Sequence, residues 1–193
     1  MNTLLLLPRN STEILLLPAP RPVAAKWHAL APLIALVGGA FGILAAAYTE
    51  FFHGSLLVAF IGAPMIEEAL KPLGIYLMLA KWPRTLRNRF YTAFLAALSG
   101  VAFAVVENIV YLNVYIEDPS RQVVLWRYTA GLGVHTLCSF IFGLGINEKL
   151  LASVKGEVKF LSCGKRFFIT AMVLHSLYNI SVTVLELRLG WLE

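Results

Sequence analysis

Long apolar runs that contain no Asp, Glu, Lys or Arg dominate the chain. Three of them, Trp27–Thr49, Tyr128–Asn147 and Phe167–Leu185, approach the roughly 20 residues that a helix needs to cross the hydrocarbon core of a bilayer. Two further runs, at about 55–80 and 90–115, reach this length only if the charged residues inside them are counted as part of the span. The pattern therefore predicts five transmembrane helices, at about 28–50, 55–80, 90–115, 123–148 and 167–189.

The composition agrees with this pattern. Of 193 residues, 59% are hydrophobic and only 14% are charged, against roughly 45–50% and 25% in an average soluble domain. These values exclude a soluble globular domain, a disordered tail and a nucleic-acid-binding module. We expect an all-α polytopic membrane protein, in which 27–193 form a single bundle of about five transmembrane helices. Residues 1–26 are expected to be a cytoplasmic or interfacial tail, because their apolar runs are too short to span.

The distribution of basic residues predicts the orientation of the chain. With five spans, the N-terminal tail and the loops 81–89 and 148–166 share one side of the membrane. Most of the 16 basic residues lie there, at Arg9, Arg21, Lys26, Lys81, Arg84, Arg87, Arg89, Lys149, Lys155, Lys159, Lys165 and Arg166. The positive-inside rule then gives a multi-pass cell-membrane protein with a cytoplasmic N-terminus and an external C-terminus. The net charge of +5 thus reflects topology and contact with the lipid bilayer, and nucleic-acid binding is not expected.

Ionisable groups inside the predicted spans are the candidate functional residues. A charged side chain at the bilayer centre costs at least roughly 2.5–3.5 kcal/mol, so such residues are functional candidates by default. Counting about 1.5 Å of rise per residue places the acidic and imidazole groups of four helices near the middle of the bilayer. These groups and the residues that accompany them in the sequence are Glu67, Glu68 and Lys71 in the second helix, Phe103, Glu107 and Asn108 in the third, His135 in the fourth, and His175 and Asn179 in the fifth.

The spacing within the second helix predicts local contacts. Glu67 and Glu68 precede Lys71 by four and three residues, so the lysine can neutralise either carboxylate. Pro64 and Pro72 bracket the glutamates, and each proline frees a backbone carbonyl and favours a kink. In a membrane such irregular backbone is stable only beside protein or a water-filled cavity.

Carboxylates and imidazoles around water suit peptide-bond hydrolysis by two routes. In one, Zn²⁺ is held by His135, His175 and either Glu107 or one member of the glutamate pair, and a remaining glutamate is the general base. In the other, without metal, a glutamate deprotonates water and His175 with Asn179 stabilises the oxyanion. The sequence contains no HExxH motif, which excludes the common zincin arrangement.

Two other classes of function are compatible with the sequence. A proton- or ion-coupled carrier would use the buried glutamates and histidines as a relay, although no inverted repeat is visible in the sequence. A non-catalytic scaffold would bind other transmembrane helices through glycine-rich faces. In that case the Glu–Glu–Lys cluster would be a structural ion pair.

Four motifs together resemble the PrsW family of intramembrane proteases. They are EEALK at 67–71, FAVVEN at 103–108, His135, and HSLYN at 175–179. The resemblance implies a protease that cuts membrane-anchored protein substrates, with Glu67 and Glu68 essential and with Glu107, His135 and His175 as further site residues.

PrsW proteins are similar in turn to the CAAX prenyl protease and bacteriocin-processing superfamily. This sequence departs from that wider pattern at Pro72, where EExxxR would have Arg, and at Glu107, where FxxxH would have His. Both departures favour the PrsW branch.

We predict a metal-assisted intramembrane endopeptidase with Glu67 as the base and Glu68 paired with Lys71. The predicted catalytic residues are Glu67, Glu68, His175 and Asn179, the predicted Zn²⁺ ligands are Glu107, His135 and His175, and the supporting residues are Lys71, Phe103 and Asn108.

Overall fold

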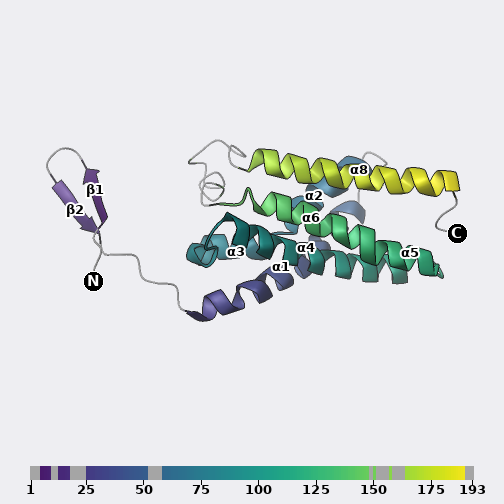
Figure 1. Cartoon of the computed structure of the whole chain (residues 1–193), viewed down its shortest axis with the longest axis horizontal. Helices are drawn as coiled ribbons and strands as arrows, with labels where there is room; N and C mark the ends of the chain where they lie inside the picture. The colour runs from purple at the N-terminus through teal and green to yellow at the C-terminus, as the bar shows by residue number, and fades with distance from the viewer. Residues whose placement is uncertain are drawn as a thin grey trace.

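The computed structural model describes residues 5–9, 13–17, 25–51, 58–147, 150, 157 and 164–189. Apart from one short hairpin, the described residues fold into helices and their connections (Figure 1). The helices are α1 (Ala25–Phe51), the π-helical turn η2 (Val58–Gly62), α2 (Ala63–Leu70), α3 (Leu73–Lys81), the 3₁₀ turn η3 (Pro83–Thr85), α4 (Arg89–Val110), the π-helical turn η4 (Tyr111–Tyr115), α5 (Arg121–Trp126), the π-helical turn η5 (Arg127–Gly131), α6 (Leu132–Gly143) and α8 (Lys165–Leu189). The predicted all-α membrane fold is confirmed.

Each of the five predicted spans contains helix. Among the described residues, three helical stretches are long and apolar enough to cross a membrane, namely Ala25–Leu44, Arg89–Tyr115 and Lys165–Leu185. The other two predicted spans are present as series of shorter helices, η2–α2–α3 and α5–η5–α6. The predicted ends at 55–57 and at 148 lie outside the described residues.

The two apolar runs of the N-terminal tail pair as an antiparallel hairpin, which the sequence pattern did not predict. Strand β1 (Leu5–Arg9) lies against β2 (Glu13–Leu17), with Leu5 opposite Leu17. The hairpin lies apart from the helices in Figure 1. Its cytoplasmic or interfacial position stays a prediction.

Glycines allow the helices of the bundle to approach closely. A Cβ atom on Gly38 of α1 would overlap the backbone of Gly74 in α3, and a Cβ on Gly74 would overlap the carbonyl group of Ile34. Between α4 and α6, a Cβ on Gly100 would lie 2.8 Å from the carbonyl oxygen of His135. Close backbone contact through small residues is typical of helix packing in membranes.

The bundle has a small buried core and an apolar exterior. Its core includes Ala35 of α1, Ile75 and Met78 of α3, Leu95 of α4 and Cys138 of α6. Large apolar side chains that remain exposed on the bundle surface include Phe41, Leu44, Ile61, Phe94, Leu137 and Leu177. An apolar exterior of this kind suits a surface that faces lipid rather than water.

The second predicted span is broken at its proline, as the sequence predicts. Helix α2 ends at Leu70 and α3 begins at Leu73. Because Pro72 has no N–H group, the carbonyl of Glu68 lacks its usual helical donor. The Ser99 hydroxyl of α4 donates to the carbonyl oxygen of Lys71 at 2.5 Å. This bond fixes the break, and with it the adjacent charged residues, against α4.

Candidate active site

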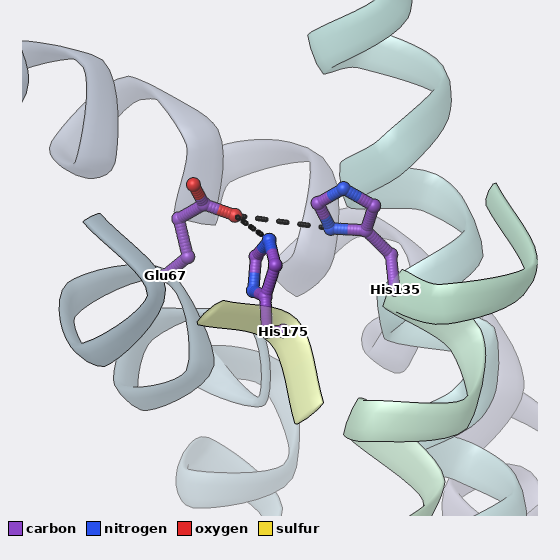
Figure 2. Close-up of side chains that lie close together, drawn as sticks. All are labelled: Glu67, His135 and His175. Atoms are coloured by element: carbon purple, nitrogen blue, oxygen red, sulfur yellow. Dashed lines mark ion pairs between the residues drawn. The ribbon is translucent and has the colours of Figure 1, made fainter. Parts of the chain in front are cut away.

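Three helices bring Glu67, His135 and His175 to one point in the bundle. The side chains come from α2, α6 and α8 and converge in Figure 2. Glu67 Oε2 lies 3.8 Å from His135 Nδ1 and 3.8 Å from His175 Nε2. All three residues are buried, with exposed fractions of 4%, 4% and 1%. One ligand atom from each lies within 4.8 Å of the others, so the group could hold a metal ion.

The spacing of these three atoms fits a shared metal ion better than direct hydrogen bonds. Hydrogen bonds between nitrogen and oxygen span about 2.7–3.2 Å, which is shorter than the 3.8 Å separations found here. Tetrahedral zinc ligands at about 2.1 Å from the ion lie about 3.4 Å from one another. Within the described part of the chain, His135 Nδ1 has no hydrogen-bond partner. Two imidazole nitrogens and one carboxylate oxygen are also a donor set that catalytic zinc sites use.

A second carboxylate lies against the other nitrogen of each histidine. His135 Nε2 is 3.1 Å from Glu107 Oε2 of α4, and His175 Nδ1 is 2.9 Å from Glu68 Oε1 of α2. Metal-bound histidines usually donate their second N–H to a carboxylate or carbonyl, which fixes the tautomer and the ring orientation. The two histidines are therefore oriented so that the remaining nitrogen of each faces Glu67.

Lys71 neutralises the glutamate pair from within the same helical segment. Its Nζ lies 2.6 Å from Glu68 Oε1 and 3.4 Å from Glu67 Oε2, so both contacts predicted from the spacing are present. Lys71 is completely buried, and its ammonium group lies 4.8 Å from the centre of the Phe103 ring. That ring also stacks on His135, at 5.9 Å between centroids. Phe103 is thus part of the wall of the site.

Arg127 is a site residue that the sequence pattern did not predict. One of its terminal guanidinium nitrogens lies 3.5 Å from Glu107 Oε2, and its Nε donates to Asn108 Oδ1 at 3.0 Å. Asn108 Nδ2 donates in return to the backbone carbonyl of Arg127 at 3.0 Å. The guanidinium group also stacks on Tyr111, 3.9 Å from the ring centre. Arg127 and Asn108 therefore hold Glu107 in place beside His135.

One feature of the sequence indicates that Arg127 could belong to the site. Position 127 falls inside the predicted fourth helix, at about 123–148, although the uncharged apolar run begins only at Tyr128. In the structure the π-helical turn η5 begins at this residue and continues directly into α6. The arginine is consequently part of the helical segment that carries His135.

The remaining predicted site residue, Asn179, lies one turn beyond His175 on α8 and is partly buried. Its backbone carbonyl accepts a hydrogen bond from Thr183 at 2.9 Å. Its role in binding an oxyanion stays a prediction.

Fold and site together define a membrane-embedded protein with a buried polar centre built from separate helices. A family model described as PrsW family intramembrane metalloprotease matches residues 22–192. The match covers most of the chain, so this chain belongs to the PrsW family, and it is an intramembrane protease that acts on membrane-anchored substrates within the bilayer. No curated protein and no solved structure matches the chain.

Proposed function

We propose that this protein is a zinc-dependent endopeptidase that hydrolyses a peptide bond of membrane-anchored protein substrates, with Glu67, His135 and His175 as the metal ligands. The observation that carries the proposal is the convergence of these three donors, with 3.8 Å from Glu67 Oε2 to each imidazole nitrogen. In this assignment Glu67 replaces Glu107 in the ligand set predicted from the sequence. The reason is that Glu107 lies against the opposite nitrogen of His135.

Each of the chain's own groups then has a distinct role. Bound zinc would supply Lewis-acid activation of water and of the scissile carbonyl. Glu68 and Glu107 hold the two imidazoles in the orientation that the ligand set needs. Glu68 is fully buried and contacts both Lys71 and His175, so we assign it a positioning role.

Because Glu67 is now a proposed ligand, we assign Glu107 as the proton acceptor in place of Glu67, the base predicted from the sequence. Its side chain is 13% exposed, whereas that of Glu68 is 0% exposed. A general base has to exchange protons with water or substrate, which favours the more accessible group. Arg127 and Asn108 orient Glu107, and the burial of the ligands limits access of bulk water to the reacting groups.

We also propose the orientation of the chain in the membrane and its relationship to a wider superfamily. The cytoplasmic N-terminus and external C-terminus are supported by the basic residues that gather on one side of the predicted topology. The proposed relationship is to the CAAX prenyl protease and bacteriocin-processing superfamily, for which the support is the Glu67–Glu68 pair of an EExxxR-like motif and Phe103 of an FxxxH-like motif.

Metal content of the purified protein tests the proposed site without a known substrate. Wild-type protein in mild detergent should contain about one zinc per chain by mass spectrometry. The variant His135→Ala/His175→Ala should lose it. His28→Ala is a matched control, since His28 belongs to α1 and is not part of the ligand group. It should keep the metal.

Cleavage of a membrane-anchored reporter in liposomes tests the activity. Glu67→Gln should abolish cleavage, and zinc removal by a chelator should do so reversibly. Glu68→Gln should lower metal affinity or activity by about 10–100-fold, as second carboxylates behind zinc-bound histidines do. Glu107→Gln removes the proposed proton acceptor and should lower activity by about 10²–10⁴-fold. Metal-free protein that still cleaves would refute the metal assignment and favour Glu67 as the base. Ion flux without cleavage would favour a carrier.

A further inference from the structure

A cavity of about 930 Å³ lies at the end of the bundle where α4 and α8 begin and α6 ends. It is lined by different residues from those of the metal site. Gly145 and Gly164 line it and approach each other so closely that a Cβ on Gly145 would lie 2.9 Å from Gly164 Cα. Gly164 has a φ of +81°, a left-handed conformation that favours glycine. These glycines let the start of α8 lie directly against the end of α6.

Three basic side chains line this cavity, and no acidic one does among its described lining residues. They are Arg89 of α4 and Lys165 and Arg166 of α8. The guanidinium groups of Arg89 and Arg166 lie 5.7 and 4.9 Å from the centre of the Phe167 ring, which also lines the cavity. Two of the three cations, Arg89 and Arg166, therefore lie close together beside the Phe167 ring. Their positive charge is available to bind an anion.

The two helices that begin here add to the positive potential. Both α4 and α8 have no acidic residue in the first turn. The positive ends of their helix dipoles therefore meet no negative charge from the first turn of either helix. The helix dipoles and the basic side chains therefore both favour a negatively charged ligand.

The rest of the lining is largely apolar. Leu79, Leu86, Ile146 and Ile169 contribute aliphatic side chains. Since α4 and α8 are each long enough to cross a membrane, their first residues lie at the depth of the lipid headgroups. A site at this depth with cations and aliphatic walls suits an amphipathic anion.

We propose that this cavity binds an anionic phospholipid, with the phosphate held by Arg89, Lys165 and Arg166 and an acyl chain along the aliphatic lining. Basic pockets between transmembrane helices bind anionic lipid headgroups in this manner. The volume lies within the range of about 300–1,000 Å³ that is usual for small-molecule sites.

Binding of tail-labelled phosphatidylglycerol to the detergent-solubilised protein tests the proposal. At low salt, wild type should bind this lipid on the order of 100-fold more tightly than tail-labelled phosphatidylcholine. The triple variant Arg89→Gln/Lys165→Gln/Arg166→Gln should lose the preference, by about fivefold for each basic side chain removed at low salt.

The control is Lys81→Gln/Arg84→Gln/Arg87→Gln, which removes the same charge from the same end of the bundle but outside the lining residues. It should keep the preference for phosphatidylglycerol. Equal loss in both triple variants would refute a defined site and indicate general surface attraction. Displacement of the lipid by inorganic phosphate at concentrations as low as those of the lipid would refute the lipid as ligand and favour a free phosphate site.

Both triple variants should elute as the wild type in size-exclusion chromatography, because all of the substituted side chains are exposed. The conservative variant Arg89→Lys/Arg166→Lys provides a second check, because it keeps all three charges and should retain most of the preference. Loss of the preference in this variant together with normal metal content would contradict a charge-based site.

Discussion

The buried ion pair between Lys71 and Glu68 offers a direct test of the site's energetics. Lys71→Met removes the ammonium group and fills the same space with an apolar chain. It leaves the Glu68 carboxylate, fully buried and previously 2.6 Å from Nζ, without its cation. Glu67, 3.4 Å from the same nitrogen, loses its lysine as well.

Removing one member of a buried ion pair costs about 3–5 kcal/mol, because the other charge is left uncompensated. We therefore expect Lys71→Met to lower the free energy of unfolding by about this amount. Glu68→Gln should cost less, near the lower end of that range, since Glu67 remains close enough to neutralise the lysine. The double variant Glu68→Gln/Lys71→Met should be no less stable than Lys71→Met alone. The coupling between the two substitutions should thus be about 3 kcal/mol.

Unfolding in mixed detergent and SDS micelles, followed by loss of helical circular dichroism, measures these differences. Lys81→Met, at the exposed end of α3, is the control and should change stability by no more than about 0.5 kcal/mol. Additive single substitutions, with coupling below about 0.5 kcal/mol, would refute the reasoning that the two charges depend on each other inside the bundle.

Further substitutions test the packing, the capping and the arginine of the site. Gly74→Ala should destabilise the bundle by about 1–3 kcal/mol in the same assay, because its Cβ would overlap the α1 backbone. Gly133→Ala, whose Cβ would meet nothing within 4 Å, should cause no loss. Asn88→Ala should cost about 1 kcal/mol, since its side chain accepts from the first turn of α4 at 2.9 Å. Arg127→Gln should reduce reporter cleavage about 10–100-fold with metal content unchanged, because Glu107 loses its orienting partner. Unchanged cleavage would contradict that role.

The helical architecture was largely predictable from hydropathy, because each helix has to be apolar over a length fixed by the bilayer. The break after Leu70 was predictable too, since Pro72 cannot donate the next helical hydrogen bond. The N-terminal hairpin was not predictable from hydropathy. The runs at Leu5–Arg9 and Glu13–Leu17 are too short to span, and pairing of two short strands leaves little trace in hydropathy.

The membership of the site was more predictable than its internal arrangement. Depth along a helix follows from counting residues, so Glu67, His135 and His175 were expected at one level. Which nitrogen of each histidine faces Glu67 depends on the rotation of α6 and α8 about their axes. Contacts such as that between Gly100 and the carbonyl of His135 set that rotation, and they join residues far apart in the sequence. The position of Glu107 behind His135 was inaccessible from the sequence for the same reason.

The position of Lys71, close in sequence to Glu67 and Glu68, has a consequence for the synthesis of the chain. The hydrogen bond between Glu68 and His175 joins residues 107 positions apart, which corresponds to about 5–20 s of translation at about 5–20 residues per second. Throughout that interval α2 is in the membrane without the helix that carries His175. Lys71, three and four residues from the glutamates, is a partner that is synthesised with them. The lysine therefore lowers the cost of inserting two acidic residues, and the nascent enzyme stays inactive until its last helix arrives.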